Sequence, residues 1–441
     1  MRLVSAAAAA VALLAVLPAG AAVRPTPAAL IANGIARADL TPAEKAEYRA
    51  VLAGARREAK RLPKARAELL QKVLADVAAQ WRGYTRPRAL VLFSTLAFNG
   101  AWLANHAVWG DHPDRTGEDG VVYRFFWSHG YVFHPLANFA KLNQTAASGD
   151  LDGTERLAQA LLGRAIPVGS KLIWEYEFPF ASGRAPWTSG MAQAVAAQAL
   201  ARAGDLLSDP ALLDAADGAY EAVPGLLSPG SPVKPWVALY SFDRTPVLNA
   251  QLQAALSVGD YAALTGQPPA EALANRLTAS AEALLPSFDT GYWSRYSLHG
   301  DDSPLHYHDY VITLLRKLAA RTGDAGWSET ADRFLAYETQ APVLRVGGIP
   351  ATLYPRPADG YRDRARIRFW LSKRSTVTLR VGHSVMSETF GHGDHTFVWE
   401  PGKKAVPGTY HPRLTAVGVT GQRVEKSLPP VRIARGPRPH R

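Results

Sequence analysis

The sequence of 441 residues contains no cysteine. This absence excludes disulfide bonds and a lipid-modified N-terminal cysteine, so the fold must be stabilised by burial of apolar side chains. The sequence also has no apolar run of the roughly 18 to 20 residues that a membrane-spanning helix needs. Hydrophobic residues nonetheless make up 47% of the chain, which is enough material for two or three domains.

Motifs that bind cofactors are also missing. We find no phosphate-binding loop, no Gly-x-Ser-x-Gly nucleophile elbow and no dinucleotide-binding glycine pattern. Possible metal ligands gather around His306, His308 and Asp309, and again around His392 and His395. Neither group contains a cysteine or a helical pair of histidines four residues apart. The sequence therefore predicts neither a cofactor nor a metal site.

The first residues have the pattern of an export signal. Arg2 is followed by a short apolar run at 4–17 and by small residues at 19–22. This order is typical of a secretory signal peptide that is cleaved after about residue 22. We therefore expect residues 1–22 to be a signal peptide and the mature protein to be secreted or associated with the cell wall.

The chain is strongly basic, with a formal net charge of +11. Removal of Arg2 with the signal would leave +10, because residues 1–22 contain no acidic side chain. A basic surface attracts polyanions such as nucleic acid, anionic envelope polymers or acidic polysaccharides. A composition bias that spreads arginine over every exposed face explains the same charge, so both interpretations stay open at this point.

Glycines recur at a regular spacing through the centre of the chain. Helical segments are expected to end at Gly149, Gly204, Gly266 and Gly323, which are 55, 62 and 57 residues apart. A period of about 57 residues accommodates two antiparallel helices with their loops, so residues 85–345 are predicted to form four helical hairpins. Such hairpins build either a solenoid or an incomplete (α/α) toroid. Before them, residues 23–84 are predicted to form an N-terminal helical hairpin and a linker.

Each predicted hairpin is preceded by a segment rich in aromatic and charged residues. These segments are 123–134, 174–187, 236–244 and 292–307. If the hairpins run parallel to one another, the four segments emerge at the same end of the array. Aromatic rings and cations that meet there would suit a sugar acid, so we expect the functional cleft at this end.

Two tyrosine motifs lie within residues 291–324. The first is a Tyr-Ser-Leu step that begins at Tyr296 after a Gly-rich turn, and the second is the pair Tyr307-His308 at the start of a predicted helix. Residues 187–194 add a Trp-Thr-Ser-Gly-Met-Ala-Gln-Ala run at the start of another predicted helix.

These motifs resemble the C-terminal domain of the D-glucuronyl C5-epimerases over roughly residues 125–340. The resemblance favours the toroid over the solenoid. It implies a secreted, cofactor-free isomerase that inverts C5 of D-glucuronyl residues in an acidic, heparosan-like polysaccharide rather than a protein that acts on nucleic acid. By the same analogy, a homodimer is possible.

The resemblance is incomplete at two positions. The family's Val-Leu-Asn run is present at 247–249, and Tyr240 stands where the family has a tyrosine before this run. The glutamate that precedes that tyrosine in the family is missing, and Asp243 is the nearest acid. The arginine expected three residues after Tyr296 is replaced by His299.

The chemistry that the resemblance implies needs an acid and a base on opposite faces of a sugar ring. Tyr296 and Tyr307 are our candidate catalytic pair, with Tyr240, Glu175 or Asp243 as alternates. A tyrosine has an ordinary pKa near 10, so we expect nearby cations to lower the pKa of the one that acts as base.

Other residues of the four segments are candidates for substrate binding. The C5 proton becomes acidic only when the neighbouring carboxylate is neutralised by a cation or a hydrogen-bond donor. Arg184, Arg244, Arg295 and His299 are candidates for that task. His308 is a candidate for orienting the substrate or relaying protons. The aromatic candidates for contact with the sugar are Trp174, Tyr176 and Trp187.

Three other functions stay open on the sequence. The same carbanion could expel the group at C4, which would make the protein a lyase. The fold could bind an acidic glycan without turning it over, because the family's glutamate is missing. A glycoside hydrolase needs two facing carboxylates, for which Glu175 and Asp243 are the available pair.

The composition changes after about residue 345. Residues 346–434 alternate in hydrophobicity or carry β-branched side chains, and turns rich in Gly, Pro, Ser and Lys separate the segments. The Pro-Gly-Thr-Tyr step at 407–410 resembles a late strand of immunoglobulin-like or fibronectin-like modules. We expect an immunoglobulin-like β-sandwich that packs on the helices or binds a wall polymer, followed by a disordered basic tail at 435–441.

Overall fold

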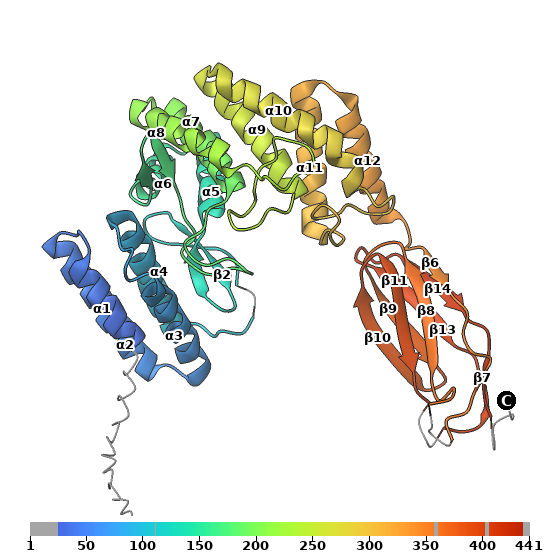
Figure 1. Cartoon of the computed structure of the whole chain (residues 1–441). Coiled ribbons are helices and arrows are strands. Elements are labelled where there is room, and N and C mark those ends of the chain that lie inside the picture. Colours follow the sequence, from blue (N-terminus) through green and yellow to red (C-terminus); the bar gives the residue numbers. More distant parts are fainter. Residues whose placement is uncertain (1–24, 111, 357–359, 402–404, 435–441) are drawn as a thin grey trace, which may run out of the picture.

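The computed structural model describes residues 25–110, 112–356, 360–401 and 405–434. The predicted signal peptide at 1–22 and the predicted tail at 435–441 lie outside these residues. The described chain is mainly helical, and a group of β-strands follows the last helix (Figure 1). None of the described helices is both long enough and apolar enough to cross a membrane.

Four helices form the N-terminal part of the described chain. They are α1 (Pro27–Arg37), α2 (Pro42–Arg61), α3 (Lys64–Ala79) and α4 (Arg86–Asn105). The hairpin predicted from the sequence corresponds to α2 and α3. Thr41 and Glu44 cap α2 reciprocally, because the Thr41 hydroxyl accepts from the Glu44 N–H while the Glu44 carboxylate accepts from the Thr41 N–H. A small antiparallel sheet follows α4 and consists of β1 (Arg115–Thr116), β2 (Val122–Phe126) and β3 (Gly130–Phe133).

The central region contains the four helical hairpins expected from the glycine spacing. They pair α5 (Pro135–Ala147) with α6 (Leu151–Leu162), α7 (Gly190–Leu207) with α8 (Pro210–Ala222), α9 (Leu248–Thr265) with α10 (Pro268–Leu284), and α11 (Leu305–Thr322) with α12 (Ala325–Thr339). The first helices pack side by side in the order α5, α7, α9 and α11, and the second helices form the outer layer (Figure 1). The four hairpins form a curved row of two layers rather than a closed ring. The incomplete toroid therefore stays a prediction.

Glycine ends three of the four first helices as expected, since Gly149 follows the α5 C-cap Ser148 with a left-handed φ of 74°. Gly266 and Gly323 adopt left-handed φ angles of 66° and 73° at the C-caps of α9 and α11, where a Cβ would be strained. The prediction that a helix ends at Gly204 was wrong, because α7 continues to Leu207 and ends at Ser208. Shorter elements join the hairpins: β4 (Ile166–Val168) with β5 (Lys171–Ile173), and the 3₁₀ turns η1 (Val223–Leu226) and η2 (Leu285–Phe288).

A buried polar side chain near the start of each first helix holds the segment that precedes it. These latch residues are Asn138, Gln193, Gln251 and His308, which are 55, 58 and 57 residues apart. The Gln193 side-chain amide donates to the carbonyl oxygen of Leu172 in the preceding segment at 2.5 Å and to that of Ala219 in the partner helix α8 at 3.2 Å. Gln193 on α7 therefore connects β5, just before the aromatic segment 174–187, with the partner helix α8.

Gln251 repeats both contacts, whereas Asn138 repeats only the contact with the segment before its helix. The Gln251 side chain accepts from the Val237 N–H at 2.8 Å and donates to the Leu277 carbonyl oxygen at 2.7 Å. The Asn138 side chain accepts from the Val122 N–H at 2.7 Å and donates to the carbonyl oxygen of the same residue at 2.8 Å. Buried backbone groups need hydrogen-bond partners, so these polar side chains allow irregular loops to enter the helical core.

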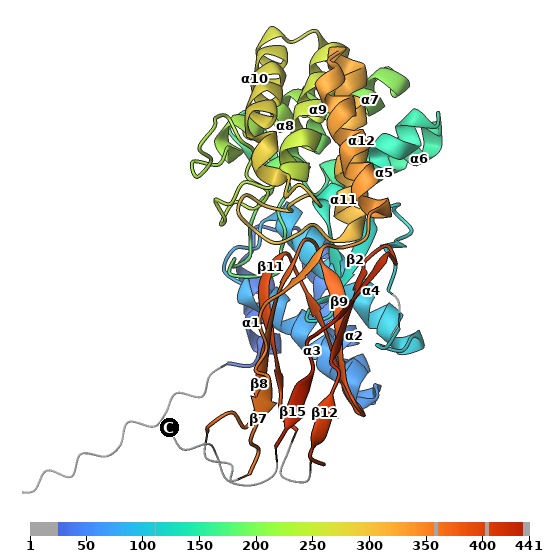
Figure 2. The same cartoon turned by 90° about the vertical axis from the view of Figure 1, so that its right-hand side faces the viewer.

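The C-terminal strands form two sheets that face each other. One sheet has the strand order β10 (Ser384–Phe390), β9 (Ser375–Val381), β13 (Arg413–Gly418) and β14 (Arg423–Ser427), and the other has β11 (Gly393–Trp399), β8 (Ala365–Leu371) and β6 (Leu344–Val346). A third small sheet contains β12 (Gly408–Tyr410), β15 (Val431–Ile433) and β7 (Thr352–Leu353). Alternate residues of the facing strands share one core that includes Phe369, Leu379 and Leu414. The sandwich lies below α11 and α12 in both views (Figures 1 and 2).

We expect Gln251→Leu to destabilise the helical region. The substitution keeps a side chain of similar size but leaves the buried Val237 N–H without its acceptor, at a cost of about 1–3 kcal/mol, and also removes the hydrogen bond to the Leu277 carbonyl of α10. Thermal unfolding followed by far-ultraviolet circular dichroism should show a lower Tm. Gln159→Leu on the exposed face of α6 is the control. Equal shifts in both variants would contradict the latch role.

Candidate active site

A cavity of about 480 Å³ lies against the inner helices of the array. Side chains from the first helices α5, α7, α9 and α11 line it together with the aromatic segments that precede them. Five residues predicted from the sequence are among the lining residues: Tyr176, Trp187, Tyr240, Tyr296 and Tyr307. The structure thus brings together side chains that are up to 131 residues apart in the chain.

Three tyrosines form the reactive part of this cavity. The ring centroids of Tyr296 and Tyr307 are 5.0 Å apart, and the Tyr296 phenol hydrogen-bonds with that of Tyr240. Local pairing positions Tyr296, since its carbonyl accepts from the Leu248 N–H at the start of α9. Tyr307 lies in the first turn of α11, where unpaired N–H groups and the helix dipole favour negative charge.

Stacked aromatic rings pack against Tyr240. Tyr176 and Trp187 pair through their backbones and stack with ring centroids 3.9 Å apart. The Trp187 ring meets the Tyr240 ring edge-on at 5.5 Å. The Trp187 indole N–H donates to the Phe178 carbonyl, so the ring has a fixed orientation. These contacts give the cavity a rigid aromatic wall.

The electrostatics of the tyrosines differ from the expectation. Burial raises the pKa of Tyr296, and the neighbouring Tyr240 and Tyr307 raise it further. Burial likewise raises the pKa of Tyr240. The predicted lowering by cations is therefore not found for these two phenols, which are protonated at neutral pH and suited to donate a proton rather than to accept one.

Sequence reasoning missed two cavity residues on the first aromatic segment, Arg124 and His134. Arg124 on β2 forms a paired contact with Asp114 at 2.9 and 2.7 Å, which holds its guanidinium in place. Burial, with a smaller contribution from Arg124, lowers the pKa of His134 to about 3. Their position in 123–134 was the available signal, because that segment was already expected to reach the cleft.

His134 is neutral and has a defined tautomer. Its Nδ1 accepts from the Ala137 N–H at 3.1 Å, where it caps α5. The proton of the neutral ring is therefore on Nε2, which can donate to an anion in the cavity. Arg124 and His134 together provide a cation and a neutral donor close to the tyrosines.

A second cationic region lies farther along the inner helices. Arg202 on α7 and Lys317 on α11 line the same cavity. Arg202 donates to the Asn143 side-chain oxygen at 3.0 Å and lies 3.5 Å from the Asp260 carboxylate. Lys317 is exposed and has no ion pair within the part of the chain that the structure describes. Lys317 is ten residues beyond Tyr307, which corresponds to about 15 Å along α11.

Glu175 and Trp174 are among the predicted residues that lie outside the cavity lining. Glu175 accepts from the Arg88 guanidinium at 2.7 and 2.9 Å, and it lies beside Glu177. Burial and the neighbouring Glu175 raise the pKa of Glu177. Trp174 is buried, with its indole N–H donating to the Leu161 carbonyl at 2.8 Å. Both residues therefore have partners that stabilise the fold.

The predicted cations also lie elsewhere. Arg184, Arg244 and His299 are exposed and do not line the cavity. Arg295 donates to the Gly300 carbonyl at 2.7 Å within its own loop. Arg124, Arg202 and Lys317 are therefore the cations that line the cavity among the described residues.

His308 is the latch of the last hairpin. Its ring is fully buried, with Nδ1 2.7 Å from the Ser294 hydroxyl and Nε2 2.9 Å from the Phe334 carbonyl oxygen of α12. The ring also stacks on Trp293 with centroids 3.8 Å apart. His308 therefore corresponds to Gln193 and Gln251 of the preceding hairpins, and it does not line the cavity.

None of the described residues that line the cavity is Asp or Glu. Asp243, the acid nearest to the missing glutamate, is exposed and accepts from the Thr245 hydroxyl and N–H. Within the described ranges, no group of three or more His, Cys, Asp or Glu could hold a metal ion. The reactive groups of the cavity are thus phenols, cations and a neutral imidazole.

Comparisons with known proteins agree with the sequence motifs. Residues 169–336 match the family model for the D-glucuronyl C5-epimerase C-terminus. An uncharacterized protein of Methanocaldococcus jannaschii is 28% identical over 165 residues, which cover 35% of this chain and 54% of that protein. The chain therefore spans about half the length of this curated relative.

Solved structures give weaker likenesses. An endo-β-1,4-glucanase of Acetobacter xylinum has a TM-score of 0.36 and 15% identity over 51% of this chain and 72% of that chain. An α-mannanase of Bacteroides thetaiotaomicron has a TM-score of 0.33 and 12% identity over 46% of this chain and 59% of that chain. Scores this low carry no argument about function.

The family match includes the segments that hold Tyr176, Trp187, Tyr240, Tyr296 and Tyr307. Arg124 and His134 come from the part of the chain before it. The match confirms the resemblance drawn from the tyrosine motifs, and it identifies residues 169–336 as related to the C-terminal part of the D-glucuronyl C5-epimerases.

Proposed function

We propose that this protein inverts C5 of D-glucuronyl residues in an acidic polysaccharide by removing and returning the C5 proton. The observation that carries the proposal is the meeting of Tyr240, Tyr296 and Tyr307 in one cavity with Arg124. The family match over residues 169–336 supports a role in polysaccharide modification. The predicted export signal supports action outside the cytoplasm, and the family analogy supports a homodimer.

The first step is removal of the C5 proton. Arg124 and the Nε2–H of His134 bind the uronate carboxylate, so the charge of the enolate that forms is stabilised. Tyr307 is the base, because it lies in the first turn of α11 and shares the cavity with the cation Arg124. The electrons of the C5–H bond move into the carboxylate as the proton moves to the Tyr307 oxygen.

The second step returns a proton to the opposite face. Tyr296 is the donor, since its raised pKa keeps its phenol protonated until the enolate forms. The electrons return from the enolate to C5 as the new C–H bond forms. The contact with Tyr240 also raises the pKa of Tyr296, so it favours the protonated phenol that this step needs.

Two alternatives differ in what they require of the cavity. A glycoside hydrolase needs a pair of carboxylates, which the described lining does not provide. A protein that only binds an acidic glycan is favoured by the missing glutamate before Tyr240. A lyase shares the first step with an epimerase and differs in whether the group at C4 leaves.

Deuterium exchange tests the proposal directly. The mature protein in heavy water should introduce deuterium at C5 of heparosan or of another uronate polymer in a panel that includes chondroitin and teichuronic polymers. The chains should keep their length and gain no unsaturated ends, because the C4 group stays in place. Unsaturated ends would establish a lyase, and binding without exchange by folded protein would establish a glycan-binding protein.

Tyr296→Phe and Tyr307→Phe should each reduce C5 exchange by about 10²- to 10⁴-fold, because each removes one proton-transfer group. The variants should retain the far-ultraviolet circular dichroism of the parent protein, since neither hydroxyl is needed to pack the ring. Tyr220→Phe on α8, outside the cavity, is the control. Near-normal exchange in either cavity variant would exclude that residue as acid or base.

Lys317→Gln should weaken binding of acidic polymers while leaving the proton-transfer groups intact. We expect KM to rise on the order of tenfold at low ionic strength, and the difference should shrink as salt screens the charge. Lys72→Gln, an exposed lysine of α3, is the control. An unchanged KM and salt dependence would show that Lys317 does not contact the polymer.

A further inference from the structure

The β-sandwich contacts the helical region through the turn between β8 and β9. Lys373 in this turn is only 2% exposed. Its Nζ donates to the carbonyl oxygens of Tyr337 at 2.5 Å and Gln340 at 2.6 Å, at the C-terminal end of α12. A second turn of the sandwich donates from the Thr420 hydroxyl to the Glu338 carbonyl oxygen at 2.7 Å. The sandwich is thus attached to the last hairpin by hydrogen bonds to its helix end.

The same lysine contacts the loop that carries the tyrosine motifs. Its Nζ lies 5.3 Å from the centroid of the Trp293 ring, a cation–π contact. Trp293 is buried, its indole N–H donates to the Ser303 carbonyl at 2.8 Å, and its ring stacks on His308. Lys373 therefore contacts the structure that joins the loop at 289–304 to α11.

Asp302 provides a second and independent link. It is only 3% exposed, and its carboxylate accepts from the backbone N–H of Arg374 in the sandwich turn at 2.7 Å. Asp302 pairs across the loop with Arg295 as an antiparallel bridge. In the same ladder, the Tyr296 N–H donates to the Asp301 carbonyl at 3.1 Å. The sandwich therefore contacts Asp302, and the neighbouring Asp301 pairs with Tyr296.

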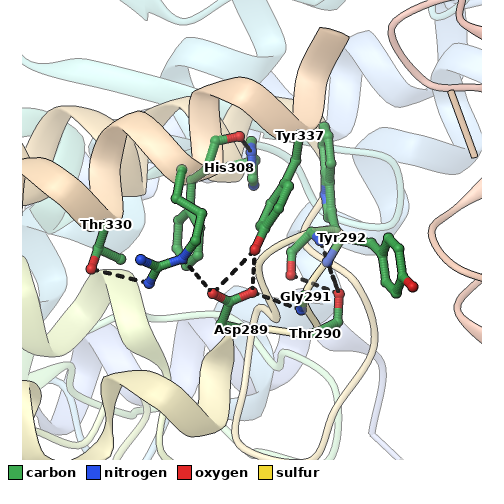
Figure 3. Close-up of polar contacts among 10 residues, drawn as sticks. Asp289, Thr290, Gly291, Tyr292, His308, Thr330 and Tyr337 are labelled. Atoms are coloured by element: carbon green, nitrogen blue, oxygen red, sulfur yellow. Dashed lines mark hydrogen bonds and ion pairs between the residues drawn. The ribbon is translucent and has the colours of Figure 1, made fainter. Parts of the chain in front are cut away.

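The start of the loop is held by α12 as well. The Asp289 carboxylate accepts from the Gly291 N–H at 2.8 Å, from Arg333 at 2.9 Å and from the Tyr337 hydroxyl at 3.1 Å (Figure 3). Figure 3 also shows Tyr292, whose ring meets Trp370 of β8 edge-on at 6.0 Å. The loop is thus fixed to α12 at its start and to the sandwich at Tyr292 and Asp302.

We propose that the C-terminal β-sandwich is a positioning element that holds the tyrosine loop at 289–304 in its active geometry, through Lys373 and the Arg374 backbone. The ladder across the loop sets where Tyr296 lies, and the segment 302–304 leads directly into the helix that carries Tyr307. Its effect on rate rests on the proposed function, whereas its effect on the order of the loop does not.

Burial explains why Lys373 and Asp302 depend on their protein partners. It lowers the pKa of Lys373 and raises that of Asp302, which means that water solvates both charges poorly. Their protein partners therefore determine where these groups lie. Removal of one partner leaves a buried polar group unsatisfied, which favours displacement of the loop from the turn.

Amide hydrogen exchange of the full chain tests the structural part. Lys373→Met keeps an unbranched side chain but removes the three donors. We expect the N–H groups of Tyr296 and Ser303, which are hydrogen-bonded within the loop, and that of Arg295, which donates to the Phe288 carbonyl just before the loop, to exchange about tenfold faster. Lys426→Met on the exposed face of β14 is the matched control. Loop exchange equal to that of the parent protein would overturn the proposal.

Steady-state kinetics of C5 exchange test the catalytic part. Lys373→Met should lower kcat on the order of 10- to 100-fold, because small displacements of acid–base groups are costly. KM should stay near the parent value, since Arg124, Arg202 and Lys317 bind the polymer from other elements. A loosened loop with unchanged kcat would overturn the positioning role, as would a change in KM alone.

A second pair of variants covers the case in which Lys373→Met fails to fold. Asp302→Asn retains an oxygen that accepts from the Arg374 N–H, so it should keep an ordered loop and most of the rate. Asp302→Ala removes the acceptor and should loosen the loop and lower kcat. Equal behaviour of the two would contradict the proposal. If the parent protein lacks exchange activity, the proposed function fails and loop exchange still decides whether the sandwich positions the loop.

Discussion

The structure depends on one repeated interaction, in which a buried polar side chain near the start of each inner helix hydrogen-bonds the segment before it. Asn138, Gln193, Gln251 and His308 provide it in four consecutive hairpins. Irregular loops normally stay at the surface because their backbone groups need water. Here side chains replace that water, so four loops can converge and build a cavity from residues far apart in the chain.

The chemistry of the cavity follows from what surrounds it. The described lining contains phenols, a neutral imidazole and cations but no carboxylate. Burial raises the pKa of Tyr296, while Tyr307 lies at a helix start beside Arg124. Two residues of the same type thus lie in different surroundings, one buried against other phenols and one at a helix start.

The ends of the chain contribute to this cavity in different ways. The segment before the family match supplies Arg124 and His134 to the cavity lining. The β-sandwich after it contacts the tyrosine loop through Lys373 and Arg374. Residues before the epimerase-like segment thus contribute Arg124 and His134 to the cavity lining, and the sandwich after it contacts the tyrosine loop.

The sequence alone determined the helical hairpins and the position of an aromatic segment before each one. Glycine caps and apolar periodicity depend on residues close together in the chain, so they can be read from the sequence. It also located the tyrosines of the cavity, since their motifs are local. It did not reveal that Arg124 lines the cavity while Arg184 and Arg244 do not, that Glu175 is held by Arg88, or that His308 is a latch. Those outcomes depend on which distant backbone groups and charges meet in space. Only the tertiary structure decides such contacts, because burial and long-range pairing set both the position and the pKa of each side chain.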